Sequence, residues 1–416
     1  MTEEPFVAPD WTKQFTVSRL ILRHYRSIAG CNIELGPLAI LVGPNGAGKS
    51  NVLDSLRLVS QALNENLDNA LRERGGISEV RRRSRGHPTH FGISVGFRSA
   101  DLHGSYAFQV AAVSGGDFRV SREECRVWWP DSDRPTNIAG GHTQALRERH
   151  YTVREGELIA SSEPLLTKVS GDRLYLVAVS GIAPFRFLYE GLTGINIYNF
   201  NPDAMRHLQK PEAGDLLRRD GSNIASLIER LRRDRPEVKA RIEDYLNRVV
   251  EGMVGVERRG LGAWETLEFR QRVAGDAAPW TFQASSMSDG TLRTLGVLSA
   301  LLGGSPNQLS PVGIEEPEAA LHPAAAGVLL DALRDASDSR QVLVTTHSPD
   351  LLDSATIAPA ELLAVRSVEG NTVVGKVDSA GQKALRENLF TPGELLRVDQ
   401  LAPEANDSTQ QPELFK

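Results

Sequence analysis

The chain has 416 residues, of which 40% are hydrophobic and 24% charged, a composition that excludes general disorder and allows one large core or two lobes. Its formal net charge of -6 excludes a general attraction to nucleic acid, so any contact with DNA has to come from a local basic patch. Only Cys31 and Cys125 are present, too few for a disulfide framework or a structural zinc site. We find no secretory leader and no apolar stretch that could span a bilayer, and we therefore expect a cytoplasmic protein without membrane insertion.

A strand, a glycine-rich loop and a helix are predicted in direct succession near the N-terminus. Residues 15–22 and 31–42 have the pattern of strands, and the second ends in the apolar run 38–42. After the glycine-rich segment 43–50, apolar residues recur at helical spacing from 52 to 67, which predicts a long amphipathic helix.

Farther along the chain the pattern changes twice. Residues 91–283 mix short strands with helices and contain no catalytic motif that we recognise. From residue 285 helices and strands alternate again, which implies an α/β fold with a sheet covered on its faces. We therefore expect an N-terminal lobe (1–100), a central insertion (101–283), a C-terminal lobe (284–400) and a polar, disordered tail (401–416).

The glycine loop matches the eight-residue Walker A pattern, in the strand-loop-helix context which that pattern requires. Its glycines let backbone N–H groups converge on phosphates, and the following helix adds the positive end of its dipole. Lys49 is expected to reach the β- and γ-phosphates of ATP, and Ser50 to place its hydroxyl on Mg²⁺. The predicted nucleotide-binding residues of the loop are Gly43, Pro44, Asn45, Gly46, Ala47, Gly48, Lys49, Ser50 and Asn51.

Two adjacent carboxylates follow the apolar residues 312–314, as in a Walker B motif. Adjacent strand residues point to opposite faces, so the two acids can do different work. Glu315 is expected to hold Mg²⁺, directly or through water, and Glu316 to orient or deprotonate the water that attacks the γ-phosphate. A solvated acidic loop is the alternative, and we interpret Glu318 as a loop or helix-start residue.

A histidine ends a second buried strand. His347 is expected to sense the γ-phosphate by hydrogen bonding and to help hold the attacking water in line. A lone histidine is usually structural, but its position after the two preceding motifs favours a catalytic role. We therefore assign catalysis to Lys49, Glu316 and His347, and metal binding to Ser50 and Glu315.

Residues 285–293, with the sequence SSMSDGTLR, resemble the signature of ABC-type ATPase heads in the variant of RecF-like and SMC-like ATPases. The motif order of Walker A, signature, Walker B and switch histidine is also that of this family. The resemblance implies that Ser288, Asp289 and Gly290 bind the ATP of a second subunit, so that the protein closes as a homodimer. A Ser-x-Gly turn that opens a helix offers N–H groups and a hydroxyl to an anion, although an ordinary capped helix is the alternative.

The resemblance covers most of the chain and implies a P-loop NTPase, an ABC-type ATPase head with a bilobal α/β core and a central α+β insertion. ATP and Mg²⁺ are the implied cofactors, and hydrolysis to ADP and phosphate the implied reaction. The motifs Ser-Asp-Gly-Thr and Glu-Glu-Pro-Glu, with the segments 25–27 and 220–224, are similar to RecF-like predicted ATPases without a nuclease domain. The chain departs from the family in carrying Glu315 where aspartate is commoner. We do not identify the interlobe glutamine, since we interpret Gln61 as solvated.

Two functions are compatible with these motifs. The first is a DNA-associated, ATP-gated dimer in DNA repair or genome maintenance. The second is the ATPase subunit of an anti-phage or toxin-like complex with a separately encoded effector. The large insertion and the variant signature disfavour a transporter motor, and we expect too few residues after His347 for a fused nuclease of the overcoming-lysogenization type. The chain has no sustained heptads for coiled-coil arms.

Two segments are candidates for partner contacts. An arginine-rich stretch could follow a DNA backbone, with a solvated loop as an equal alternative. The tail residues Gln411, Leu414 and Phe415 resemble the peptide by which bacterial DNA-processing proteins bind the sliding clamp. The arginines of the stretch are Arg72, Arg74, Arg81, Arg82, Arg83 and Arg85.

Overall fold

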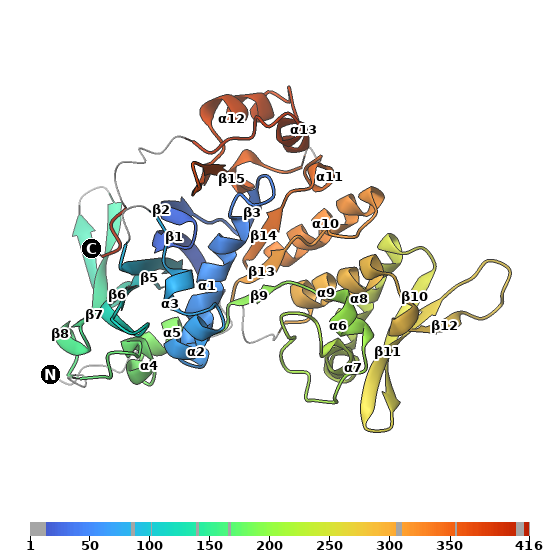
Figure 1. The fold of residues 1–416 in the computed structure, drawn as a ribbon, viewed down its shortest axis with the longest axis horizontal. Helices are drawn as coiled ribbons and strands as arrows, with labels where there is room; N and C mark the ends of the chain where they lie inside the picture. The colour runs from blue at the N-terminus through green and yellow to red at the C-terminus, as the bar shows by residue number, and fades with distance from the viewer. Residues whose placement is uncertain are drawn as a thin grey trace.

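The computed structural model of the chain contains three β-sheets with helices packed between and around them (Figure 1). It describes residues 14–84, 88–100, 102–138, 141–164, 168–304, 310–353, 356–404 and 412–415, without the side chains of 131–145. Within these ranges, no helix is both long and apolar enough to cross a membrane.

A six-stranded sheet forms the centre of the molecule. Its strand order is β16-β15-β3-β14-β13-β9, and all neighbouring strands are parallel except β15 and β16. The parallel arrangement places the carboxyl ends of β3, β14 and β13 along one edge, where ligands bind in open α/β sheets. The strands are β3 (Leu38–Val42), β9 (Asn196–Tyr198), β13 (Val312–Glu315), β14 (Val342–Thr346), β15 (Leu362–Val368) and β16 (Asn371–Lys376).

The six-stranded sheet separates two hydrophobic cores. Ala39 and Leu41 of β3 belong to the core that contains helix α1 (Lys49–Asn64), whereas Ile40 belongs to the core that contains α9 (Asp289–Leu302). Every residue of β3 is buried. Burial on both faces explains why residues 38–42 are a continuous apolar run without alternation.

A seven-stranded antiparallel sheet, in the order β2-β1-β4-β5-β6-β7-β8, packs on the same core as α1. Two expectations from the sequence are wrong here.

The single strand expected at 31–42 is interrupted at Gly36 and Pro37, and its two parts belong to different sheets. The boundary expected at residue 100 falls between hydrogen-bonded neighbours, so no insertion begins there. The strands are β1 (Thr16–Tyr25), β2 (Ile28–Glu34), β4 (His90–Arg98), β5 (His103–Ala112), β6 (Phe118–Ile138), β7 (Gly141–Arg154) and β8 (Glu157–Ser161).

Between β9 and α9 the chain forms a helical layer with a three-stranded antiparallel sheet (Figure 1). This is the insertion, and it is shorter than expected because β5 to β9 belong to the other two sheets. Its strands are β10 (Met253–Leu261), β11 (Trp264–Gln271) and β12 (Trp280–Gln283), and its helices α6 (Pro202–Arg206), α7 (Ile224–Asp234) and α8 (Pro236–Val249). The other helices are α2 (Leu67–Arg72), α3 (Ile77–Val80), α4 (Tyr175–Val179), α5 (Phe185–Thr193), α10 (Ala326–Ser337), α11 (Pro349–Leu352), α12 (Ser379–Arg386) and α13 (Pro392–Arg397).

The expectation of a disordered tail from residue 401 is wrong for the tail residues that the structure describes. Leu401 is 2% exposed, and Pro403 forms a β-bridge with Val377. Leu414 is 4% exposed, against the seven-stranded sheet. Burial of apolar side chains stabilises such contacts even in a polar segment. Gln411 lies outside the described residues.

Candidate nucleotide-binding site

The loop at residues 43–50 runs from the end of β3 into the first turn of α1. Gly43 lies against β15, where a Cβ would stand 2.0 Å from the carbonyl oxygen of Val365. Gly48 has a φ of 100°, and a Cβ there would stand 2.1 Å from Oγ1 of Thr372. Only glycine fits at these two positions, so the shape of the loop is fixed by its neighbours in the fold.

Lys49 is folded back onto this loop. The residue is 5% exposed, and its ammonium donates hydrogen bonds to the carbonyl oxygens of Gly43 at 2.8 Å and Pro44 at 3.0 Å. Burial lowers the pKa of Lys49, and the carboxylates of Glu316 and Glu318 raise it. A buried cation bonded to neutral carbonyls favours the binding of a phosphate group.

A chain of hydroxyl and amide groups holds the loop from two sides. Nδ2 of Asn51 donates to Oγ of Ser27 at 2.6 Å, and the hydroxyls of Ser27 and Thr372 share a hydrogen bond of 2.7 Å. Oγ1 of Thr372 also donates to the carbonyl oxygen of Ala47 at 2.8 Å. The loop is therefore tied to the β1–β2 turn and to the β15–β16 hairpin, and the structure places Asn51 in this brace.

Glu315, the expected metal ligand at the end of β13, is paired with a cation of the chain itself. Its Oε1 accepts a hydrogen bond from Nη2 of Arg219 at 2.9 Å, and its side chain is 12% exposed. Arg219 lies in the loop before α7, and no sequence motif points to it. The second expected ligand, Ser50, is exposed at the start of α1.

The donor set fits Mg²⁺ bound together with a nucleotide. Mg²⁺ takes oxygen ligands and usually keeps several waters or phosphate oxygens, so one hydroxyl and one carboxylate from the protein suffice. The described residues contain no group of three His, Cys, Asp or Glu side chains that could hold a metal by themselves. Metal binding at Ser50 and Glu315 would therefore depend on the phosphates.

The structure brings the predicted catalytic pair together. Oε1 of Glu316 lies 3.1 Å from Nδ1 of His347. Glu316 has a φ of 46°, which is rare for a residue with a side chain, and its N–H donates to the carbonyl oxygen of Thr345 at 2.9 Å. Such a backbone at a site is the kind of strain that the surrounding structure has to maintain.

Glu318 lies in a turn, as expected, but its side chain is buried beside this pair. Its Oε1 accepts a hydrogen bond from Oγ1 of Thr346 at 2.5 Å, and its Oε2 is buried without a partner among the described residues. Burial raises the pKa of Glu318, although the Thr346 bond and His347 lower it. Pro317 lies in the turn between Glu316 and Glu318. In the sequence, this proline was the feature that indicated a turn here.

The signature segment forms the N-terminus of α9. Oγ of Ser288 accepts a hydrogen bond from the N–H of Thr291 at 3.2 Å, which makes Ser288 the helix cap. A Cβ at Gly290 would stand 2.5 Å from the carbonyl oxygen of Ala320, so the segment packs against the turn that follows β13. Ser288 and Asp289 are exposed. The segment therefore presents a helix N-terminus at the surface, where an anion is favoured.

Two arginines connect the signature helix to its surroundings. Arg206 of α6 pairs with Asp289 at 2.5 Å. Arg293, one turn into α9, donates to the carbonyl oxygens of Phe200 at 2.8 Å and Glu316 at 3.4 Å. The start of α9 is thus positioned relative to the acidic end of β13 within one chain.

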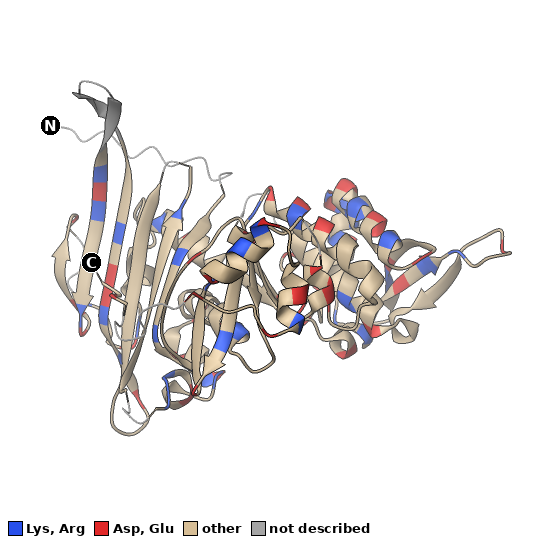
Figure 2. Ribbon diagram, turned by 90° about the horizontal axis from the view of Figure 1, so that it is seen from above, with Lys and Arg blue, Asp and Glu red and all other residues tan. Residues whose placement is uncertain are grey.

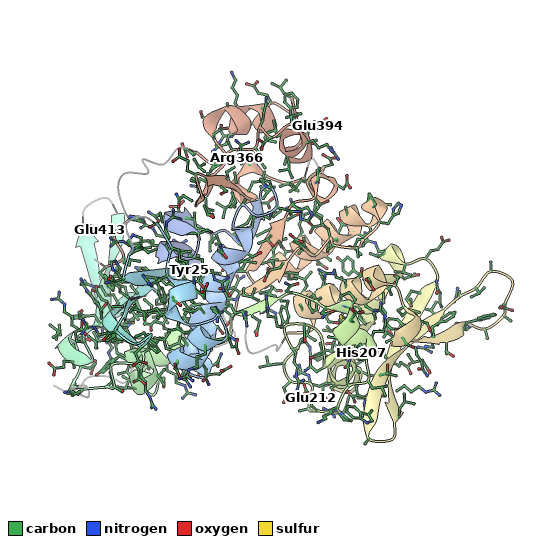
Figure 3. The ribbon with its side chains drawn as sticks, in the orientation of Figure 1. Tyr25, His207, Glu212, Arg366, Glu394 and Glu413 are labelled. Carbon is green, nitrogen blue, oxygen red and sulfur yellow. The ribbon has the colours of Figure 1, made fainter. Side chains whose placement is uncertain are left out.

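Asp54 of α1 is the centre of a largely buried polar cluster. It accepts a hydrogen bond from the hydroxyl of Tyr25 at 2.7 Å and pairs with Arg74 and Arg26, each at 3.0 Å (Figure 3 labels Tyr25). Burial raises the pKa of Asp54, but the guanidinium groups of Arg74 and Arg26 lower it further, and the net shift is downward. Gln61 accepts from Arg74 at 2.8 Å, so its interpretation as a solvated residue is wrong.

Most of the predicted arginine stretch is engaged within the chain. The side chain of Arg74 is 2% exposed, and Arg82 donates to the carbonyl oxygen of Ser27 and to Oδ1 of Asn371. Arg72 and Arg83 pair with acidic residues one helical turn away. Figure 2 shows basic and acidic residues interspersed along the helices. Arg74 and Arg82 are therefore engaged within the fold, whereas Arg72 and Arg83 are exposed, as in the solvated loop given as the alternative. Arg85 lies outside the described residues, and contact of this stretch with DNA stays a prediction.

The parallel sheet, the phosphate loop after β3 and the acidic end of β13 define a P-loop NTPase of the ABC type. Solved structures confirm the predicted fold. An SMC head bound to the C-terminal winged-helix domain of ScpA has a TM-score of 0.53 and 13% identity, covering 88% of this chain and 99% of that chain. An SMC head with an extended coiled coil, bound to the C-terminal domain of ScpA derived from Pyrococcus furiosus, has a TM-score of 0.51 and 12% identity, covering 90% and 100%.

The chain belongs to the family described as "AAA domain, putative AbiEii toxin, Type IV TA system", whose model matches residues 38–353. It is 32% identical over 117 residues to structural maintenance of chromosomes protein 4 of Dictyostelium discoideum, over 26% of this chain. It is 46% identical over 44 residues to the DNA replication and repair protein RecF of Vibrio vulnificus, over 10% of this chain. These matches span only 8% and 12% of the two relatives. They confirm the predicted resemblance to RecF-like and SMC-like ATPases.

Proposed function

We propose that the chain is an ATPase that closes as a homodimer around two ATP molecules and acts on or near DNA in genome maintenance. The observation that carries this proposal is that one chain presents two complementary halves of an anion site. One half is the loop at 43–50 with the buried ammonium of Lys49, and the other is the exposed cap of α9 at Ser288. The similarity to RecF, named for DNA replication and repair, supports the role at DNA.

In the proposed reaction, Lys49 binds the β- and γ-phosphates, and Ser50 and Glu315 would hold Mg²⁺, which would supply further positive charge. Glu316 accepts a proton from the attacking water as the water oxygen bonds to the γ-phosphorus. The bond from that phosphorus to the bridging oxygen breaks, and ADP and phosphate are released. His347, 3.1 Å from Glu316, holds the carboxylate in position for the water.

Light scattering on the full chain tests the proposal. Glu316→Gln blocks hydrolysis and should convert the protein into a dimer with Mg²⁺ and ATP, whereas Ser288→Arg in the same background should remain monomeric. A mass that never responds to ATP would contradict the homodimer. A second series with duplex DNA should show an ATP-dependent increase in DNA affinity, and equal affinity with and without ATP would contradict the role at DNA.

A second candidate is the ATPase subunit of an anti-phage or toxin-like complex with a separately encoded effector. The family description, which names a toxin of a type IV toxin–antitoxin system, favours it. Expression of the chain with the product of a neighbouring gene, followed by copurification with and without ATP, distinguishes the two candidates. Growth arrest that requires Lys49 would support the second candidate.

A further inference from the structure

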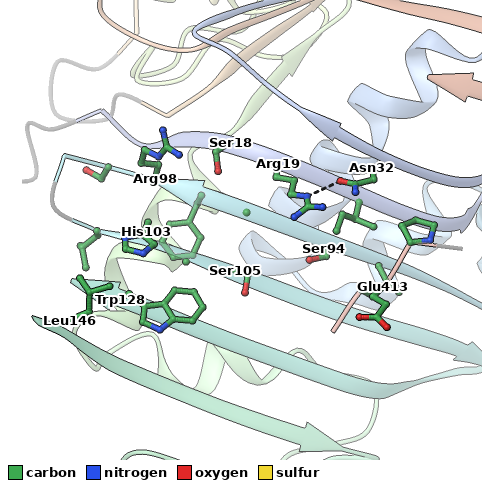
Figure 4. Close-up of a pocket in the computed structure, with 18 of the residues that line it drawn as sticks. Ser18, Arg19, Asn32, Ser94, Arg98, His103, Ser105, Trp128, Leu146 and Glu413 are labelled. Carbon is green, nitrogen blue, oxygen red and sulfur yellow. Dashed lines mark hydrogen bonds between the residues drawn. The ribbon is translucent and has the colours of Figure 1, made fainter. Parts of the chain in front are cut away.

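The C-terminal segment Pro412–Phe415 lies on the outward face of the seven-stranded sheet (Figures 3 and 4 label Glu413). A Cβ at Gly92 of β4 would stand 2.2 Å from Cδ1 of Leu414. A Cβ at Gly30 of β2 would stand 2.9 Å from Cδ of Pro412. Both contacts depend on the absence of a side chain, so the sheet is shaped to receive these two residues.

The strand register explains why the two glycines form a trough. Residues directly opposite each other in neighbouring strands share a face, and Gly30 and Gly92 both lie opposite Arg23 of β1. The row continues from Gly92 through Gln109 of β5 to Arg122 of β6. The Arg122 guanidinium stands 4.2 Å from the centroid of the Phe415 ring, a cation–π contact. The trough thus provides an apolar cradle for Leu414 and a cation for the ring that follows.

The segment lines one end of a cavity of about 680 Å³ (Figure 4). The other walls carry Arg19, whose Nε donates to Asn32 at 2.7 Å, and His103, which stacks on Trp128 with ring centroids 5.7 Å apart. Small residues, including Ser94 and Ser105, form part of its lining. The cavity is therefore open to an extended peptide, and the C-terminal segment is the peptide that the chain itself supplies.

We propose that this trough is a peptide-binding site for the chain's own C-terminus, and that it masks a partner-binding peptide. The predicted clamp-binding residues include Leu414 and Phe415, the two side chains that the trough holds. Leu414 cannot fill a pocket on the sheet and a pocket on a partner at the same time. A partner with an apolar pocket for a Leu–Phe pair, of the sliding-clamp kind, therefore has to displace the segment from the sheet.

Tethering makes this masking effective even when the intrinsic affinity is weak. Seven residues separate Pro412 from Glu404, whose N–H donates to the carbonyl oxygen of Lys376 at 2.7 Å. A short tether gives the segment an effective concentration of about 1 mM at the trough. If the free peptide binds the trough with a Kd of roughly 100 μM, the docked form outnumbers the released form by about ten to one. A partner should then bind about tenfold more weakly than it binds a chain with a released segment.

Carboxypeptidase digestion of the full chain, followed by mass spectrometry, tests the docking. After removal of Lys416, wild-type protein should release Phe415 and Leu414 about tenfold more slowly than Gly92→Val, which fills the cradle. Arg122→Gln should accelerate release about two- to fivefold without touching the core. Arg126→Gln is the matched control, because Arg126 lies on the same strand and pairs with the same Glu124, and its release rate should equal that of wild type.

Binding of the same proteins to a purified bacterial sliding clamp tests the masking. Gly92→Val and Arg122→Gln should bind more tightly than wild type, and Leu414→Ala should lose binding. Nucleotide binding by each variant confirms that it is folded. If Gly92→Val does not fold, the comparison of wild type with Arg122→Gln alone tests the proposal. Equal release rates for wild type and Arg122→Gln would overturn the docking site. If wild type and the two trough variants bind the clamp with equal affinity, or if no protein binds it, the proposal that the trough masks a partner-binding peptide is overturned. Neither result affects the proposed ATPase, which these variants leave intact.

Discussion

Arg219 and Glu315 form an ion pair of 2.9 Å at the acidic end of β13, so a guanidinium stands against the carboxylate assigned to Mg²⁺. The pair brings together the loop before α7 and the strand end, nearly one hundred residues apart in the chain. Glu315 is therefore paired with a cation of the protein, and a metal ion at this carboxylate has to compete with the guanidinium.

The first prediction follows from that competition. Arg219→Gln should lower the Mg²⁺ concentration needed for half-maximal ATP binding by about two- to fivefold, because a partly exposed pair contributes little free energy. A titration of a fluorescent ATP analogue at several Mg²⁺ concentrations measures this. Arg218→Gln is the control, since Arg218 pairs with Glu212 at 2.6 Å. An unchanged Mg²⁺ requirement in Arg219→Gln would contradict the competition.

The second prediction separates the two adjacent acids. Glu316→Gln should reduce ATP hydrolysis by about 10²- to 10⁴-fold, because the substitution removes the general base. ATP binding should persist, because no contact with a phosphate is removed. Glu315→Gln should instead weaken Mg²⁺-dependent ATP binding. Phosphate release and nucleotide titration distinguish the variants, and a Glu316→Gln protein that hydrolyses ATP at the wild-type rate would refute the assignment.

The third prediction concerns the loop glycines. Gly48→Ala should abolish ATP binding, because its methyl group would stand 2.1 Å from Oγ1 of Thr372. Gly46→Ala is the matched control: Gly46 also has a positive φ, of 76°, but a Cβ there meets nothing within 4 Å, so only the backbone cost of about 1 kcal/mol remains. Calorimetric ATP binding compares the two, and similar losses in both would show that the contact with Thr372 is unimportant. Thr372→Ala should partly restore binding to Gly48→Ala.

The fourth prediction concerns stability. Asp54→Asn should lower the free energy of unfolding by about 3 kcal/mol, since the buried guanidinium of Arg74 loses its counter-charge. The pKa of Asp54 is lowered below its ordinary value of 3.8, so its ionised form is stabilised in the folded state. This contribution is fully present above that value and is lost as the pH falls through the lower, folded-state pKa.

Urea unfolding of wild type and Asp54→Asn between pH 7 and pH 3 measures this effect. The difference between the two proteins should be constant near neutrality and should shrink only at the acidic end. Asp68→Asn, which breaks the exposed pair with Arg72, should cost less than about 1 kcal/mol and serves as the control. A difference that disappears already at pH 6 would point to another group.

Local patterns predicted the parts of the site that depend on local sequence. The loop at 43–50, the acids at 315 and 316 and the cap at Ser288 each follow from a strand, turn or helix end within about ten residues. Arg219 and Thr372 could not be found in this way, because tertiary contacts bring them to the site from distant segments. The engagement of Arg74 within the fold could not be predicted for the same reason: the acid that pairs with Arg74 is Asp54 of α1, 20 residues earlier in the chain.

The fold was predictable in class but not in its boundaries. The apolar run 38–42 predicted a buried strand, yet nothing local distinguished it from residues 31–34, which belong to an antiparallel sheet. Gly36 and Pro37, between the two strands, were the feature of the sequence that could have indicated the break. The extent of the seven-stranded sheet was missed because antiparallel strands with outward polar residues resemble the short strands of an insertion.

The position of β3 in the central sheet has a consequence for synthesis of the protein. β3 lies between β14 and β15, whose residues begin at Val342 and Leu362. A ribosome therefore makes the phosphate loop early but supplies both of its flanking strands only near the end of translation. Until then a nascent chain carries a Walker A sequence without the neighbours that shape it. Chains truncated before these strands should be unable to bind ATP, so nucleotide binding also reports that the chain was translated through β15.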